Sequence, residues 1–173
     1  SRAYNLLRSE DVINTLNCLK KLGIKIKLNN KYCEIVGNGI NGYKYKKNLT
    51  LDTGNSGTAA RLIIATLIKS PVSIKITGDS SLRKRDMKRI IEPLEKFGAM
   101  FKKNNGKLPL SIKGSNIIKP IRYNEFRGSA QVKSACCLAA LNANGKTKLK
   151  CKPSRNHTEL LFKYLKIPIK INK

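Results

Sequence analysis

The chain repeats one order of strands and helices. In its middle part, a strand is expected at 72–76, followed by a loop at 78–85 and a helix that ends at Phe97-Gly98. An Asn-Asn-Gly turn at 104–106 then joins two further strands. Another strand and helix precede this segment, so the unit reads strand, helix, strand, helix, strand, strand. A period of about 70 residues suits a supersecondary unit repeated within one domain.

The same order starts near each end of the chain. The first copy has an expected strand at 4–7, a helix capped by Ser9 and ended by Gly23, and a hairpin of strands at 24–28 and 32–36.

The third copy has an expected strand at 147–151, a helix carrying Leu160, Leu161 and Leu165, and a strand at 167–171. Two mostly apolar helices, at 58–67 and 129–141, lie between the copies and should be buried. The pattern predicts an α/β (α+β) fold with two near-complete units and a truncated third. Residues 1–173 would form a single partial domain.

The segment 51–67, LDTGNSGTAARLIIATL, combines a small-residue turn with the start of a helix. The first N–H groups of a helix lack intrahelical partners and carry partial positive charge, and glycine lets an anion approach them closely. Arg61 adds a full charge. One interpretation is a cradle for phosphate or carboxylate. The alternative is an ordinary buried helix capped by Thr58 or Asn55.

The charge balance is strongly basic, with 36 Lys+Arg against 10 Asp+Glu and a net charge of +26. Such a total can indicate nucleic acid or an anionic membrane surface. Here the lysines are spread over every segment together with abundant Asn and Ile, and aromatic residues make up only 6%. We interpret the charge as a compositional bias and expect neither a nucleic-acid nor a membrane partner.

Five cysteines and a single histidine, His157, limit the metal chemistry. No Cys-x-x-Cys pair is present, so neither zinc nor a cofactor is expected. Cys136 and Cys137 fall within an apolar helix and are expected in the core. The odd cysteine count and the lack of a long apolar run favour a reducing, cytoplasmic location.

Five segments carry a resemblance to a known family: LLRSEDV (6–12), LDTGNSGTAARL (51–62), GDSSLRKRDMKRIIEPLEKFGA (78–99), SAQVKSA (129–135) and SRNHTE (154–159). In this order and at these separations they resemble the enolpyruvyl transferases, and among them the 5-enolpyruvylshikimate-3-phosphate synthases. The resemblance implies a domain of βαβαββ units around buried parallel helices, of the inverse α/β barrel type. It also implies a second domain that is absent from these residues.

The resemblance assigns roles where the residues match. The expected phosphoenolpyruvate-binding residues are Asn55, Gly57, Thr58, Arg85 and Gln131. The expected shikimate-3-phosphate-binding residues are Ser129, Ala130, Gln131, Ser154 and Arg155. Both substrates are anions, for which arginine offers a planar fork of donors. No catalytic acid or base is expected within these residues, because the family carries them in the other domain.

The implied activity is transfer of the enolpyruvyl group from phosphoenolpyruvate to shikimate-3-phosphate with release of phosphate. As part of the enzyme, these residues are expected to bind shikimate-3-phosphate weakly and to be inactive alone, and the complete protein is expected to be a monomer. Asp86 stands where the family usually has proline, beside Arg85. Two alternatives stay open. One is the relative that uses UDP-N-acetylglucosamine, which usually has a cysteine in the loop at 78–85, and the other is a basic nucleic-acid-binding module.

Overall fold

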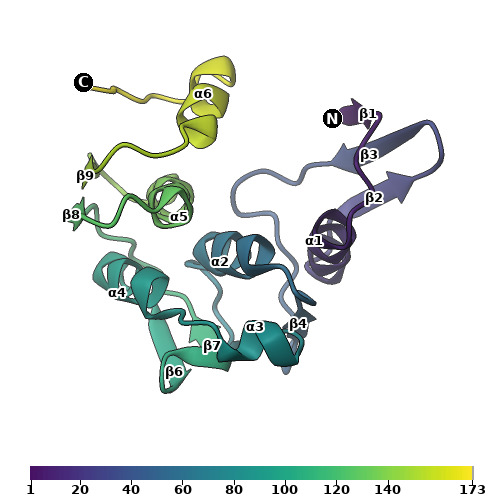
Figure 1. Cartoon of the computed structure of the whole chain (residues 1–173), viewed down its shortest axis with the longest axis horizontal. Coiled ribbons are helices and arrows are strands. Elements are labelled where there is room, and N and C mark those ends of the chain that lie inside the picture. The colour runs from purple at the N-terminus through teal and green to yellow at the C-terminus, as the bar shows by residue number, and fades with distance from the viewer. Residues whose placement is uncertain (173) are drawn as a thin grey trace.

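The computed structural model describes residues 1–172, except for the side chain of Lys103, and places three groups of elements around a central pair of helices (Figure 1). The central helices are α2 (Gly57–Thr66) and α5 (Ala130–Ala140). The middle group has the complete repeat and contains α2, and its strands lie on one side of these two helices. Its elements are β4 (Thr50–Asp52), α2 (Gly57–Thr66), β5 (Ile74–Thr77), α3 (Ser80–Lys84), α4 (Lys88–Phe97), β6 (Met100–Asn104) and β7 (Lys107–Lys113). The sheet order is β4-β5-β7-β6, with β4 and β5 parallel and the other pairs antiparallel.

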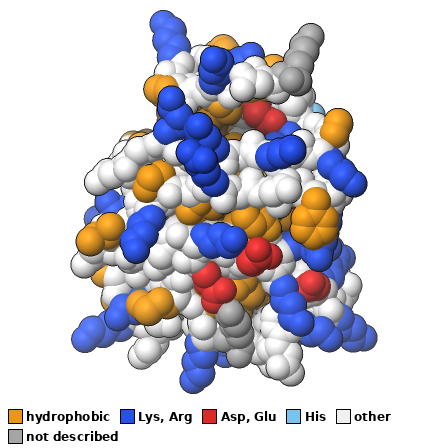
Figure 2. Space-filling view, turned by 90° about the vertical axis from the view of Figure 1, so that its left-hand side faces the viewer, with side chains coloured by type: hydrophobic (Ala, Val, Ile, Leu, Met, Phe, Trp, Pro, Cys, Tyr) orange, Lys and Arg blue, Asp and Glu red, His pale blue; other side chains and the backbone are white. Residues whose placement is uncertain are grey.

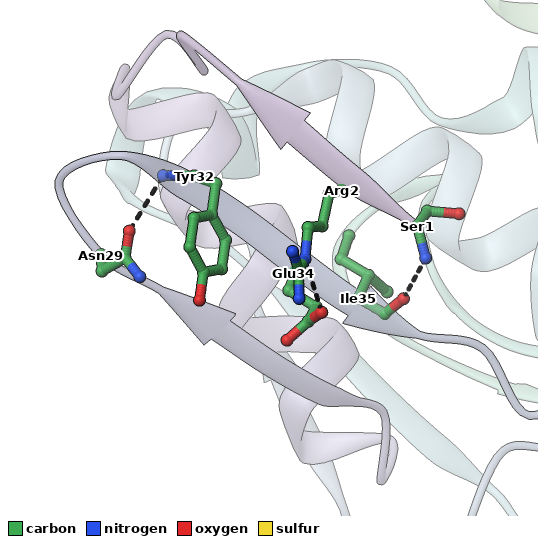
Figure 3. Close-up of polar contacts among 6 residues, drawn as sticks. All are labelled: Ser1, Arg2, Asn29, Tyr32, Glu34 and Ile35. Carbon is green, nitrogen blue, oxygen red and sulfur yellow. Dashed lines mark hydrogen bonds and ion pairs between the residues drawn. The ribbon is translucent and has the colours of Figure 1, made fainter.

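The first group matches the second half of that repeat. It contains β1 (Arg2–Tyr4), α1 (Glu10–Lys21), β2 (Lys25–Leu28) and β3 (Tyr32–Val36), in an antiparallel sheet of order β1-β3-β2. Polar contacts pin this sheet at both ends, as Figure 3 shows: the Ser1 amino group donates to the Ile35 carbonyl, and the Tyr32 N–H donates to the side chain of Asn29. The Arg2 guanidinium pairs with Glu34 at 2.8 Å across the exposed face.

The last group matches the first half of the repeat. It contains β8 (Arg122–Glu125), α5 (Ala130–Ala140), β9 (Lys148–Cys151) and α6 (His157–Tyr164), and β8 pairs with β9 in parallel as β4 does with β5. Each outer group thus repeats strand pairings of the middle group: the first group repeats its antiparallel pairs, and the last group repeats its parallel pair. These pairings confirm the repeat and the α/β class that the sequence predicts.

The core lies where α2, α4 and α5 meet the sheet of the middle group. Many buried residues of α2 and α5 are small, which suits close packing of these helices: they are Ala59, Ala60, Ala65, Ala135, Cys136 and Ala139. The fully buried large side chains include Leu51, Ile64, Ile76, Leu94 and Phe97. The predicted burial of the two central helices is confirmed.

Cysteine burial also follows the prediction. Cys136 and Cys137 are buried free thiols on α5. Burial raises the pKa of the Cys137 thiol to about 11 and moves the pKa of Cys136 higher still. Thiols so hard to ionise are poor nucleophiles, which suits a packing role.

Several element boundaries differ from the sequence predictions. The first strand ends at Tyr4, because Asn5 takes a left-handed conformation with φ 52°, so residues 5–7 are not a strand as expected. The loop at 78–85 contains the short helix α3, whose first turn Asp79 caps by accepting the N–H of Leu82 at 2.7 Å. Strand β8 was not expected at all.

The N-cap of α2 is Ser56, whose Oγ accepts the Ala59 N–H at 3.1 Å, so the prediction of Thr58 or Asn55 was wrong. Both of those side chains bond elsewhere, as described below. The strand expected at 167–171 is also wrong: the structure assigns no strand there within residues 1–172. Lys166 has φ 56°, and Pro168 cannot donate to a sheet ladder.

The basic side chains are spread over the surface. On the face in Figure 2, Lys and Arg side chains run from top to bottom and are interrupted by hydrophobic, acidic and other groups. Among residues 1–172, no helix is both long and apolar enough to cross a bilayer.

Candidate anion-binding site

Two loops that follow the parallel strands β4 and β5 are bonded to each other. The Thr53 N–H and hydroxyl both donate to the Thr77 carbonyl at 3.0 Å, and the Asp79 N–H donates to the Gly54 carbonyl at 2.9 Å. Since the carboxyl ends of parallel strands lie at the same edge of a sheet, the start of α2 is brought beside α3. The turn in segment 51–67 therefore lies next to the loop at 78–85, which contains Arg83 and Arg85.

Asn55 connects these two loops through its side-chain amide. Its Nδ2 donates to Asp79 at 2.6 Å, and its Oδ1 accepts from the Arg85 guanidinium at 2.8 Å. The pKa of Asp79 lies below its usual value, chiefly because the carboxylate accepts the Leu82 N–H and also because it accepts from Asn55. Asn55 thereby holds Arg85 near the N-terminus of α2, and most N–H groups of the Arg85 guanidinium remain available to a ligand.

Arg61 occupies the centre of the site and is only 7% exposed. Its Nη1 donates to the Gly57 carbonyl at 3.3 Å and to Gln131 Oε1 at 3.0 Å, and its Nη2 donates to the Asp86 carbonyl at 3.1 Å. Its Nε is buried and has no partner within residues 1–172.

Burial lowers the pKa of Arg61, and the nearby guanidinium groups of Arg89 and Arg85 lower it further. The guanidinium groups of Arg61, Arg85 and Arg89 repel one another, and the nearby Asp86 carboxylate offsets part of this repulsion. An anion bound among them would offset more of it, so the cluster favours anion binding.

Gln131 joins the first turn of α5 to the first turn of α2. Its Oε1 accepts from Arg61, and its Nε2 donates to the Thr58 hydroxyl at 2.8 Å. Gly57 lies close to two guanidinium groups of this cluster. A Cβ added to Gly57 would be 2.8 Å from Arg61 Nη1 and 3.3 Å from Arg85 Nη1. The structure thus brings all five residues predicted for phosphoenolpyruvate into one connected cluster.

The second predicted set lies around the start of α5. Ser129 caps this helix by accepting the Val132 N–H at 3.3 Å, and its own N–H donates to the buried carboxylate of Glu125 at 2.8 Å. Ala130 is the first helical residue, and Gln131, which belongs to both predicted sets, follows it.

Ser154 and Arg155 come from the loop between β9 and α6. This loop runs close to the turn before α5, since a Cβ on Gly128 would be 3.4 Å from the Pro153 carbonyl oxygen. The Ser154 hydroxyl is buried and has no partner within the described residues, and Arg155 is exposed. The shikimate-3-phosphate set therefore spans two adjacent segments, and the roles of its members stay a prediction.

Two hollows in the described surface, the larger of them beside the hydrogen-bonded cluster, do not include the predicted residues in their lining. The larger, of about 510 Å³, is lined mainly by α1 together with Asp52 and Gly54, and the other, of about 410 Å³, lies near Gly23 and Lys44. The predicted residues instead form an open, polar surface. The hydrogen-bonded cluster is the candidate site, because convergent charged donors recognise an anion and hollow volume alone does not.

Sequence reasoning left three members out of the predicted set. Arg61 was recognised only as an added charge, although a lone arginine in an apolar helix is a signal for a buried, bonded cation. Asp79 and Asp86 were not predicted as members. The Asp86 carboxylate accepts the N–H of Lys88, the first residue of α4, at 2.7 Å. The backbone carbonyl of Asp86 accepts from the Arg61 guanidinium. Among residues 1–172, no group of three or more His, Cys, Asp or Glu side chains could hold a metal ion.

Comparison with known proteins adds independent findings. The chain matches the family "EPSP synthase (3-phosphoshikimate 1-carboxyvinyltransferase)" over residues 1–173. It is 46% identical to the 3-phosphoshikimate 1-carboxyvinyltransferase of Ruthia magnifica over 175 residues, which is 100% of this chain and 40% of that protein. The corresponding enzyme of Caldicellulosiruptor saccharolyticus is 44% identical over 92% of the chain and 37% of its own length.

A solved structure agrees with these matches. The EPSP synthase of Acinetobacter baumannii superposes with a TM-score of 0.91 at 35% identity, over 99% of this chain and 39% of that one. The chain spans about 40% of the length of the relatives it matches. The resemblance seen in the sequence is confirmed: the chain belongs to the EPSP synthase (3-phosphoshikimate 1-carboxyvinyltransferase) family.

Proposed function

We propose that the protein containing these residues transfers the enolpyruvyl group of phosphoenolpyruvate to shikimate-3-phosphate, with release of phosphate. Residues 1–173 supply part of one of its two domains and part of its substrate site. The acid and base of the reaction come from outside these residues, and no cofactor or metal takes part. Supporting the proposal are the family membership and the cluster centred on Arg61.

The observation that carries the proposal is that the Arg61 guanidinium bonds to both α2 and α5. It bonds to Gln131 on α5 and to the Gly57 carbonyl on α2 at 3.0 and 3.3 Å, so two helix starts are held at one point. Helix N-termini and guanidinium groups both favour anions. Phosphoenolpyruvate, with a phosphate and a carboxylate, is proposed to bind at Arg85 and the first turn of α2.

The proposed roles are those that the family resemblance assigns. Asn55, Gly57, Thr58, Arg85 and Gln131 hold phosphoenolpyruvate, and Ser129, Ala130, Gln131, Ser154 and Arg155 hold shikimate-3-phosphate. The group in transfer passes through a cationic and then a tetrahedral state. Fixed donors in these positions would stabilise that state by electrostatics and would keep the two reactants close.

The test uses the complete protein encoded by the reading frame that contains this chain. Phosphate release is measured with phosphoenolpyruvate and either shikimate-3-phosphate or UDP-N-acetylglucosamine as acceptor. We expect release only with shikimate-3-phosphate. Preference for the UDP-sugar would replace the proposed acceptor. Inactivity with both, together with tight DNA or RNA binding at physiological salt, would replace the function.

Two further properties belong to the same proposal. Five free cysteines support a reducing, cytoplasmic location. We also infer that the complete protein acts as a monomer on small molecules. Light scattering at assay concentrations tests this, and a stable dimer would contradict it.

A further inference from the structure

Lys133 and Glu159 form a nearly buried ion pair between α5 and α6. Lys133 Nζ lies 2.5 Å from Glu159 Oε1, and each side chain is 11% exposed. The other carboxylate oxygen of Glu159 is buried without a hydrogen-bond partner in the described chain. One residue away along both helices, the hydroxyls of Ser134 and Thr158 are 2.7 Å apart. Two adjacent polar contacts therefore join these helices.

Helix α6 has few other attachments. Its buried residues are Glu159 and Phe162, and its N-cap, Asn156, makes no side-chain capping bond. Figure 1 shows the helix beside α5 at the C-terminal end of the fold. The remaining apolar side chains of α6 and its C-cap, each at least 52% exposed, are Leu160, Leu161, Tyr164 and Leu165. An apolar contact such as that of Phe162 is non-directional, so it does not fix how far α6 lies along α5.

The ion pair is suited to fixing that position. A buried pair adds little net stability relative to apolar residues of the same size, and its best attested use is to set the register of packed elements. Lys133 lies one turn after Ser129, and Glu159, in the first turn of α6, lies four residues after Arg155. We propose that the Lys133–Glu159 pair positions the β9–α6 loop against the start of α5, and so shapes the shikimate-3-phosphate subsite. The inference rests on the proposed function.

The two residues are positioning residues, since they act through Ser129 and the loop at 154–155. A shift of about 1 Å in a binding group can cost up to about a hundredfold in activity. The phosphoenolpyruvate cluster is attached to α2 and α3 and shares only Gln131 with α5. Losing the pair should therefore affect the two substrates unequally.

The experiment uses the complete protein and a double variant, Lys133→Met with Glu159→Leu. Both charges are removed together, and side chains of similar size keep the packing, so the fold should survive. We expect the KM for shikimate-3-phosphate to rise at least about tenfold, whereas the KM for phosphoenolpyruvate stays within about threefold. Hydrogen exchange at 152–157, measured without substrate, should become faster. Lys133→Arg, which can still pair with Glu159, should retain a near-normal KM.

The exposed pair Glu92–Lys96 on α4, 4.0 Å apart, supplies the control: Glu92→Gln should change neither KM nor exchange. Unchanged shikimate-3-phosphate KM and unchanged exchange in the double variant would overturn the inference. So would an equal rise in both KM values, or a double variant that fails to fold, because either result would make the pair a general stability element. Failure of the proposed function would show separately, as an inactive unmodified protein.

Discussion

Gly57→Ala is the substitution whose effect the structure predicts most directly. The new methyl group would lie 2.8 Å from Arg61 Nη1, about 0.6 Å inside an ordinary contact of 3.4 Å, and 3.3 Å from Arg85 Nη1. Gly57 is the first residue of α2 and does not have a positive φ, so alanine suits its backbone. The strain therefore falls on the two guanidinium groups and not on the main chain.

The effect on stability should be small because two contributions oppose each other. Alanine in a helix is favoured over glycine by up to about 1 kcal/mol. Weakening the bond from Arg61 to the Gly57 carbonyl costs about 1 kcal/mol. The melting temperature of the complete protein should therefore change by less than about 5 °C.

The effect on phosphoenolpyruvate should be large. The methyl group occupies the approach to the first turn of α2 and displaces donors that the anion needs. Losing one charge-assisted hydrogen bond costs about 1.5–3 kcal/mol, so the KM for phosphoenolpyruvate should rise about 10- to 150-fold. Anionic mimics of this substrate should lose affinity in the same direction.

Steady-state kinetics of the complete protein, with each substrate varied in turn, measures this effect. Gly37→Ala is the matched control, because a Cβ at Gly37 meets nothing within 4 Å and its φ is not positive. A Gly57→Ala protein that folds normally and keeps its KM for phosphoenolpyruvate within twofold would show that the anion does not bind at the start of α2.

Three further predictions concern α2 and its neighbour α1. Ser56→Ala removes the cap of α2 and should lower the free energy of unfolding by about 1 kcal/mol in urea titrations. A loss below about 0.3 kcal/mol would mean that Ser56 is not the effective cap. Arg61→Met leaves the acceptors on Gly57, Gln131 and Asp86 unpaired and should cost about 2–4 kcal/mol in the same assay, so an unchanged midpoint would contradict its bonded, buried role. Burial raises the pKa of the Cys18 thiol from 9.0 to about 11, so the folded state holds this proton more tightly and stability falls as pH rises from 9 to 11. Cys18→Ala should lose less stability over that range than the unmodified protein, and equal losses would refute the assignment.

The repeat could be predicted from the sequence because its signals are local. Ser9 caps α1 as expected, and strand β3 falls at 32–36 as predicted. The wrong N-cap of α2 arose because distant groups compete with local preference. Asn55 and Thr58 are good capping residues, yet Asp79, Arg85 and Gln131 occupy their side chains, and Ser56 caps the helix instead. No window of sequence around residue 56 contains that information.

The site was predictable to a different extent. Resemblance supplied the candidate residues, and the structure brings the phosphoenolpyruvate set together. The central position of Arg61 was not predictable, because its partners lie 4, 25 and 70 residues away and depend on how α2, α4 and α5 pack. The sequence pattern made no prediction for the burial of Leu160, Leu161 and Leu165, which the structure exposes. Helical spacing alone does not tell which side of a helix faces the core.

The repeat also explains why the anion site lies where it does. Helices α2 and α5 hold the same place in consecutive units: each follows the first strand of its unit, each is capped by a serine, and each is largely buried. Packing two such equivalent helices side by side brings their N-termini to one surface, where the dipoles would repel each other. Arg61 and Gln131 bridge the two ends through donors and acceptors without supplying a negative charge. An arrangement that concentrates positive potential, which Asp86 and Asp79 offset only in part, is suited to a doubly charged substrate, and an anion bound there should stabilise the fold.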